Sequence, residues 1–493
     1  MLLCGVDVGT SSIKFSVVDA ANQQIIYSSS YPENENEIYS PAPGFAEQDP
    51  EHWWYCVQQA ILKANASQTY NAADIGAIGI SYQMHGLVVL DEDHHVVRPS
   101  IIWCDSRSVA IGKQAYDGIG HAYCQNNLLN SPGNFTASKL AWVKENQPEL
   151  YDRIALVMLP GDFIAGRLTK QFTTTASALS EGIFYDFQSN EISKPLIDYY
   201  GFDAALFPQI QEVFSNHGII DAKVASSLGL NHQVQITYKA GDQPNNAFSL
   251  GCLNPGDIAT TAGTSGVVYG ISDELKYDKF NRVNSFAHVN YTHDTTRVGV
   301  LMCINGTGIL NRWVKQTVCP ELSYAEMNAL AATTSIGSKG LLCVPFGNGA
   351  ERIFQNKQIG ASFETLDFNR HGRAEMIRSA QEGIAFSMAY GIEMLADAGI
   401  KPSKLKAGFA NMYLSDIFSQ TIVNAANVSV DLLESDGAFG AALGAGFGIG
   451  YFASAEEAVA NIKQIKTINP NKDKIEQTKI AYETWKELVN EKL

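Results

Sequence analysis

The stretch Leu2-Leu3-Cys4-Gly5-Val6-Asp7-Val8 runs into the turn Gly9-Thr10-Ser11, and Ile13-Lys14-Phe15-Ser16-Val17-Val18 follows it. Apolar and β-branched residues on both sides of a short glycine-bearing turn predict a β-hairpin. Such a turn presents backbone N–H groups and hydroxyls together, which suits a phosphate group. One copy alone is more often simply a turn and is weak evidence for a phosphate site.

The same pattern returns about half the chain later. Ile258-Ala259-Thr260-Thr261-Ala262 leads into Gly263-Thr264-Ser265, and Gly266-Val267-Val268-Tyr269 follows. Two copies predict a nucleotide held between two related domains. Strand and helix patterns alternate in both halves, which favours an α/β fold. We expect domains at 1–243 and 244–493, a short hinge near 240–250, and a charged helical tail from residue 455 that packs on the outside.

The composition excludes some classes of protein. The chain has 493 residues and a formal net charge of −16. Without a compact Lys/Arg run, this charge disfavours a nucleic-acid or anionic-membrane partner. The eight cysteines form no Cys-x-x-Cys pair and no apolar run is long enough to span a membrane, and we expect no signal peptide before Gly5. These features predict a location in a reducing cytoplasm.

The phosphate chemistry must rest on the hairpins, because the sequence has no P-loop motif and no Gly-x-Gly-x-x-Gly after its first strand. Asp7 stands two residues before Gly9 in an otherwise apolar strand. A carboxylate there is costly unless it meets a cation. We therefore interpret Asp7 as a residue near Mg²⁺, acting through water beside a triphosphate.

Asp242 is the candidate for proton transfer. It follows a strand-like run, 234–238, and stands at the start of a small-residue helix. One interpretation is a helix N-cap. The other is a general base in an interdomain cleft, since phosphoryl transfer to an alcohol needs a carboxylate that accepts the hydroxyl proton. The local sequence leaves both open.

Two further segments follow predicted strands. Gln83-Met84-His85-Gly86 comes after a buried strand, at the kind of position where α/β domains form ligand crevices. Trp103 can offer an apolar face to a sugar, and Asp105 can bind sugar hydroxyls. An alternative for Asp105 is a structural pair with Arg107.

Taken in order, these motifs resemble the FGGY family of carbohydrate kinases, within the sugar kinase/actin superfamily. The resemblance runs from Asp7 to about Gly446 and includes Lys139-Leu140-Ala141-Trp142 and Glu382-Gly383. It implies two ribonuclease-H-like domains around an interdomain cleft that closes on ATP and a ketose. The Met84-His85 pair is most similar to the members that phosphorylate D-xylulose.

The resemblance also implies roles for single residues. Asp242 would accept the proton, and Asp7 would lie near Mg²⁺. The sugar would meet Gln83, Met84, His85, Trp103, Asp105 and Gln243. The phosphates would meet Gly9, Thr10, Ser11, Gly263, Thr264 and Ser265, and the rest of the nucleotide would meet Gly308, Ala410 and Asn411.

The chain departs from the family pattern at three places, the first of which is Gly349-Ala350-Glu351-Arg352 where the family has Gly-Glu-Arg. The family's Asp-Asn is Asp242-Gln243 here, followed by Pro244-Asn245. The family's Gly-Gly-Gly-Ala adenosine motif is absent, and its glycines fall on Ala410-Asn411-Met412. Side chains at these positions change how the backbone meets the nucleotide. Nucleotide affinity or specificity is therefore expected to differ.

The expected activity is ATP- and Mg²⁺-dependent phosphorylation of a ketopentose, with D-xylulose and its terminal hydroxyl as the leading choice. Another ketose or polyol kinase of the family, such as one for ribulose, is an alternative. A non-catalytic sugar or nucleotide sensor and an actin-like assembly protein are alternatives from other classes. The expected partners are a small-molecule sugar and ATP, and the family suggests a homodimer.

Overall fold

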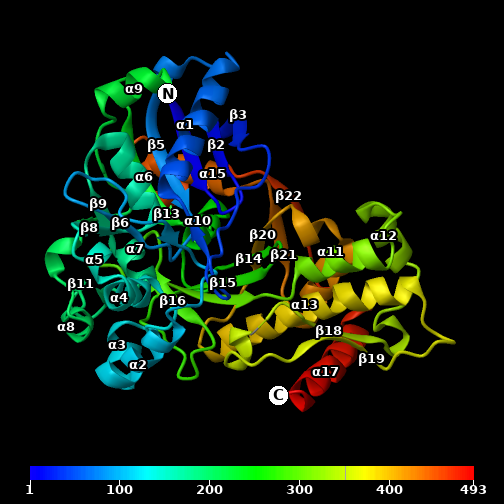
Figure 1. Ribbon diagram of the computed structural model, residues 1–493. Coiled ribbons are helices and arrows are strands. Elements are labelled where there is room, and N and C mark those ends of the chain that lie inside the picture. The colour runs from blue at the N-terminus through cyan, green and yellow to red at the C-terminus, as the bar shows by residue number, and fades with distance from the viewer. Residues whose placement is uncertain (350) are drawn as a thin grey trace.

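The computed structural model describes residues 1–349 and 351–493. Two mixed sheets, each flanked by helices, form two α/β domains that lie side by side (Figure 1). The first sheet has the order β13-β5-β1-β2-β3. Its strands are β1 (Leu2–Val8), β2 (Ile13–Asp19), β3 (Gln24–Tyr31), β5 (Ile75–Tyr82) and β13 (Gln235–Gly241).

The second sheet has the order β16-β17-β15-β14-β20-β21-β22. Its strands are β14 (Ile258–Ala262), β15 (Gly266–Ser272), β16 (Asn284–Ala287), β17 (Val298–Ile304), β20 (Leu405–Gly408), β21 (Val430–Leu433) and β22 (Gln464–Ile468). The inner five strands repeat the first sheet: three parallel strands, then two antiparallel ones. Both predicted hairpins are confirmed, as β1–β2 and β14–β15.

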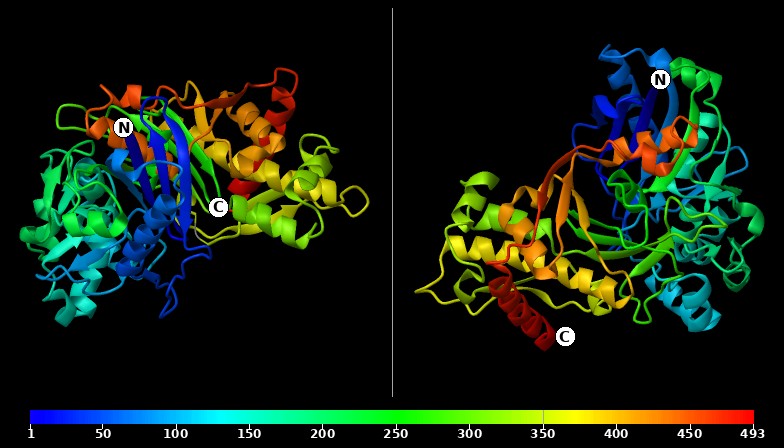
Figure 2. Two further views of the ribbon diagram at one scale, coloured as in Figure 1. Left: turned by 90° about the horizontal axis from the view of Figure 1, so that it is seen from above. Right: turned by 180° about the vertical axis from the view of Figure 1, so that it is seen from behind.

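Helices cover both sheets (Figure 2). The longer ones are α1 (Pro50–Ala66), α2 (Val109–Ile119), α4 (Thr136–Asn146), α6 (Pro160–Thr169), α10 (Asp242–Ser249), α11 (Gly308–Thr317), α12 (Tyr324–Ala331), α13 (Arg373–Asp397), α14 (Asp416–Ala426), α15 (Gly437–Gly448) and α17 (Ile475–Glu491). The shorter ones are α3 (His121–Asn127), α5 (Pro148–Tyr151), α7 (Ala176–Glu181), α8 (Lys194–Tyr200), α9 (Ala222–Leu228) and α16 (Ala455–Ala458).

Short strand pairs complete the fold. They are β4 (Glu47–Gln48) with β7 (Ser100–Ile101), β6 (Val88–Leu90) with β8 (Leu156–Met158), β9 (Thr173–Thr175) with β12 (Gln209–Gln211), β10 (Tyr185–Asp186) with β11 (Glu191–Ile192), and β18 (Leu342–Phe346) with β19 (Gly360–Glu364). The segment 242–249, where a hinge was expected, is the helix α10.

Helix α15 comes from the second half of the chain but packs on the first sheet, against β1, β5 and β13 (Figure 1). Gly5 and Gly79 make this possible, because a Cβ on either would lie within 2 Å of a carbonyl oxygen of α15. The glycines in the two strands therefore let the helix backbone lie directly on the sheet.

The C-terminal tail differs from the expectation of an outer helix alone. Residues 464–468 form β22, which pairs antiparallel with β21 at the edge of the second sheet. In α17, Tyr482, Trp485 and Val489 are buried. The Trp485 indole donates a hydrogen bond to the Cys343 carbonyl oxygen at 2.9 Å. The tail is therefore part of the second domain's core, because its apolar face covers α13 and β18.

Candidate active site

Three of the predicted site segments meet at one edge of the first sheet. Strands β1, β5 and β13 are parallel, and their registers align Val8 with Tyr82 and Tyr82 with Gly241. The residues that follow these strands therefore leave the sheet together: the Gly9-Thr10-Ser11 turn, Gln83-Met84-His85, and Asp242. In α/β sheets, ligands bind at the carboxyl ends of parallel strands.

The first turn is tied to its neighbours by its threonine. The Thr10 hydroxyl donates to Gln83 Oε1 and accepts from the Trp103 indole, both at 3.0 Å. Gln83 in turn donates to Gln48 Oε1 at 3.0 Å. The Gly9 amide donates to the Ser12 carbonyl oxygen, and Ser11 is exposed. The side chains of Thr10 and Gln83 therefore fix the conformation of the turn. About half of the Trp103 surface remains exposed.

Asp242 is the first residue of α10, and protein atoms shield its carboxylate from much of the solvent. Burial, together with the nearby Asp7, raises the pKa of Asp242 to about 7, although the side chain and backbone amide of Gln243 donate hydrogen bonds to it. Burial also raises the pKa of Asp7, and the nearby Ser81 hydroxyl and Lys14 oppose this shift. Asp7 lies against the start of α15, since a Cβ on Gly437 would be 2.5 Å from its Oδ2.

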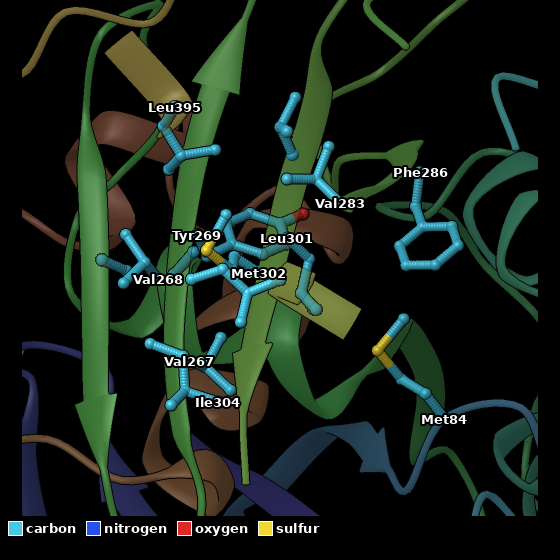
Figure 3. Packing of buried hydrophobic residues seen from close by; sticks show 14 of the residues in the cluster. Met84, Val267, Val268, Tyr269, Val283, Phe286, Leu301, Met302, Ile304 and Leu395 are labelled. Carbon is cyan, nitrogen blue, oxygen red and sulfur yellow. The ribbon is translucent and has the colours of Figure 1, made fainter. Parts of the chain in front are cut away.

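His85 is held as a neutral imidazole. Its Nδ1 lies 2.9 Å from the Glu181 carbonyl oxygen. Because a carbonyl only accepts, Nδ1 carries the proton and Nε2 remains an acceptor. Burial, then Lys139, lowers the pKa of His85 to about 3. The ring packs against Phe135 and against Phe286 of the second domain. Figure 3 shows Met84 beside Phe286, at the edge of the core built on β15 and β17.

Asp105 uses its carboxylate within the protein. Its Oδ2 accepts from the Ala46 amide at 2.6 Å and pairs with the Arg107 guanidinium at 2.7 Å. Arg107 also pairs with Glu47, which pairs with Arg98. All four side chains are nearly inaccessible. This geometry favours the structural pair with Arg107 over a direct sugar contact, and the sugar-binding role of Asp105 stays a prediction.

The second turn is joined to the N-terminus of α11. The Gly308 and Ile309 amides donate to the carbonyl oxygens of Gly263 and Thr264, at 2.9 and 3.1 Å. Gly308 is required here, because a Cβ would lie 2.2 Å from the Gly263 oxygen. Cys303 on β17 pairs in register with Val267, just after the second turn. Burial, then the Glu351 carboxylate, raises the pKa of the Cys303 thiol to about 11, and Asp242 contributes in the same direction. The second turn and Asp242 therefore lie within electrostatic range of the same thiol.

A pocket of about 390 Å³ adjoins this turn. It is lined by Ala262, Gly263, Thr264, Gly308, Ile309, Asn311, Arg312, Tyr324, Asn328, Asn411, Met412, Leu414 and Ser415. The described lining has apolar, amide and guanidinium groups and no carboxylate, which suits an anionic ligand with an apolar ring. Asn411 has a left-handed backbone (φ 53°), a conformation that glycine and asparagine adopt most readily. Ala410 immediately precedes it and is not part of the lining.

The sequence predicts no role for several residues that shape the site, although Glu351 and Lys139 lie in segments that resemble the family. The Glu351 carboxylate accepts from the Asn305 and Gly306 amides and so shapes the turn into α11. Glu181 is fully buried, and burial followed by the nearby Asp242 raises its pKa well above the usual value. Lys139 was noted only as part of a family motif, yet it binds the His85 carbonyl oxygen. Their partners are mostly backbone groups, which leave no sequence pattern.

Within the described residues, no group of three or more His, Cys, Asp or Glu side chains is arranged to hold a metal ion. Asp7 and Asp242 offer carboxylate oxygens, and Mg²⁺ binds through one or two carboxylates while keeping several waters. The residues present are therefore compatible with Mg²⁺ that arrives bound to a nucleotide.

Among the residues that the structure describes, no helix combines the length and apolar character that crossing a membrane needs.

Comparisons with known proteins agree with this architecture. The chain is 28% identical to the xylulose kinase of Staphylococcus epidermidis over 98% of this chain and 96% of that protein. Its fold matches the crystal structure of a "xyloylose kinase" from Brucella ovis with a TM-score of 0.89, at 25% identity and 99% and 98% coverage. A gluconate kinase from Lactobacillus acidophilus matches with the same TM-score, at 22% identity and 99% and 97% coverage.

Models of the N-terminal and C-terminal domains of the FGGY carbohydrate kinases match residues 2–249 and 258–449. These ranges contain both turns, the His85 loop, Asp242 and the pocket beside α11. The protein therefore belongs to the FGGY family of carbohydrate kinases.

Proposed function

We propose that this kinase transfers the γ-phosphoryl group of ATP to D-xylulose, forming D-xylulose 5-phosphate, with Asp242 as general base. The position of Asp242 carries the proposal. It lies at the carboxyl ends of three parallel strands and beside the His85 loop. Its charge also contributes to the raised pKa of the Cys303 thiol in the second domain. The curated relatives named xylulose kinase support the choice of sugar.

In the proposed reaction, the terminal hydroxyl oxygen of the sugar attacks the γ-phosphorus as its proton passes to the Asp242 carboxylate. The bond from the γ-phosphorus to the bridging oxygen breaks, and ADP leaves. The neutral His85 accepts a hydrogen bond from another sugar hydroxyl through Nε2, and the exposed Trp103 face covers the carbon skeleton. Positioning and charge neutralisation supply most of the rate in this class of reaction.

The first turn and Asp7 would hold the phosphates and Mg²⁺ from the side of the first domain. Mg²⁺ would neutralise charge on the phosphates as the bond to the bridging oxygen breaks. Asp7 suits this role because it is a buried carboxylate whose pKa is raised by burial despite the nearby Ser81 and Lys14. The pocket beside α11 would hold the nucleoside, with Asn411 in place of a family glycine.

A coupled ADP-release assay over a sugar panel tests the proposed substrate. We expect kcat/KM for D-xylulose to exceed that for D-ribulose, glycerol and D-gluconate by about tenfold or more, since one misplaced hydroxyl leaves polar groups of a built site unpaired. A higher value for any of the other three would transfer the assignment to that sugar. An absence of sugar-dependent ADP release would favour a binding protein.

The pH dependence of the reaction follows from Asp242. An acid whose pKa is about 7 is protonated below that pH, and only the ionised form accepts a proton. We therefore expect kcat/KM for MgATP to be constant above pH 7.5 and to fall about tenfold per pH unit below about pH 6.5. This constant reports the enzyme before the nucleotide and its cation bind. A flat profile down to pH 5.5 would contradict the assignment.

A further inference from the structure

Lys139 is a fully buried lysine close to the cleft, and the reaction as described does not use it. It lies on α4 with no exposed surface. Its Nζ donates to the His85 carbonyl oxygen at 2.8 Å and to the Ile102 carbonyl oxygen at 3.0 Å. Removing a lysine from water is unfavourable, so its position needs a compensating set of contacts.

The two carbonyls belong to the two segments that would contact the sugar. His85 ends the loop after β5, and Ile102 directly precedes Trp103. No regular strand pairing joins the ends of these segments, although the Leu87 amide donates to the Ile101 carbonyl oxygen nearby. Lys139 therefore links the backbone at His85 to the backbone at Trp103 through one side chain.

His85 itself adopts a backbone that needs support. Its φ is 63°, a left-handed value that a non-glycine residue adopts only where neighbours hold it. Helix α4 and the residue before it supply two of these neighbours. The Phe135 ring packs on the imidazole with 4.9 Å between the ring centroids, and Lys139, one turn later, donates a hydrogen bond to the His85 carbonyl oxygen. The Glu181 carbonyl then fixes the ring orientation through Nδ1.

We propose that Lys139 is a positioning residue for the sugar: it holds the His85 and Trp103 segments at a fixed separation, so that Nε2 of the His85 ring, which the Glu181 carbonyl orients, faces the sugar. This inference rests on the proposed placement of the sugar beside His85. The clamp acts on the sugar side of the cleft only, since none of its contacts reaches the second turn or the pocket beside α11.

The chain provides a matched control on the same helix. Lys144 also donates to two backbone carbonyls, those of Tyr200 and Gly201, but these lie at the C-terminal end of α8. Lys139→Met and Lys144→Met therefore remove the same kind of contact from the same helix. We expect Lys139→Met to raise the KM and the directly measured Kd for the sugar by about tenfold or more. The KM for MgATP should stay within about threefold, and Lys144→Met should leave both constants within about threefold.

Equal effects of Lys139→Met on the sugar and MgATP constants, or sugar effects of the same size in both variants, would overturn the proposal. Should Lys139→Met not fold, Lys139→Arg decides, because a guanidinium keeps the charge and the donors but its length and planar shape change the separation of the two carbonyls. We expect it to raise the Kd for the sugar by about threefold or more and to leave the Kd for MgADP within about twofold, and equal changes in both constants would overturn the proposal. Failure of the proposed function would show separately, as a lack of sugar-dependent ADP release by the wild type.

Discussion

Replacing Asp242 with asparagine is expected to lower kcat by roughly 10²–10⁴-fold while the Kd for the sugar changes by less than about threefold. The substitution keeps the shape of the side chain and removes only its capacity to take a proton. Asparagine also removes the charge that is unfavourably placed near Asp7, so the variant should be at least as stable as the wild type. Steady-state kinetics, sugar calorimetry and urea unfolding measure the three quantities.

A buried aspartate away from the cleft provides the control. Asp186 accepts hydrogen bonds from the Tyr123 hydroxyl and the Asn127 amide. Asp186→Asn makes the same chemical change in the same domain, and we expect it to lower stability and to leave kcat of the folded protein unchanged. If Asp242→Asn kept more than about a tenth of the wild-type kcat, another group would have to take the proton.

The parts of the fold that follow from local chemistry could be predicted from the sequence. Both hairpins, and the position of Asp242 between a strand and a helix of small residues, are found where expected. Each depends on alternation, a glycine turn or a run of small residues within about ten positions. The domain boundary between residues 243 and 244 stays a prediction. Helix α15 lies after this boundary in the sequence but packs on the first sheet, so the boundary does not separate the packed elements cleanly.

The parts that depend on distant partners could not be predicted. The strand at 464–468 is short and largely exposed, and only its pairing with β21 defines it. Lys139 meets carbonyls 54 and 37 residues away, and a carbonyl exists at every position of a chain. The role of Gln83 is similar, since its partners Thr10 and Gln48 lie on other elements. For Asp105 the pair with Arg107 was one of the two interpretations, and only its contact with the Ala46 amide depends on a distant segment. One available signal went unused: glycines inside buried strands mark the close approach of another backbone.

Those strand glycines lead to the second large effect. Gly5→Ala is expected to destabilise the protein by about 3 kcal/mol or more, because overpacking a buried backbone contact costs at least as much as overpacking side chains. The new Cβ would lie 1.7 Å from the Ala438 carbonyl oxygen and 2.7 Å from the Ala442 amide nitrogen. Neither atom can swing away as a side chain can. Helix α15 must therefore shift as a unit, and urea unfolding measures the loss.

The shift should also reach the site, which separates this prediction from ordinary core damage. The start of α15 touches Asp7, and Asp436 at its N-cap lies close enough to affect the Asp7 charge. Folded Gly5→Ala protein should therefore bind MgADP more weakly than the wild type. Gly408→Ala is the control, because its Cβ would meet only the Ser435 carbonyl oxygen, at 3.6 Å. If the two variants had equal free energies of unfolding, the direct packing of the α15 backbone on β1 would not be needed for stability.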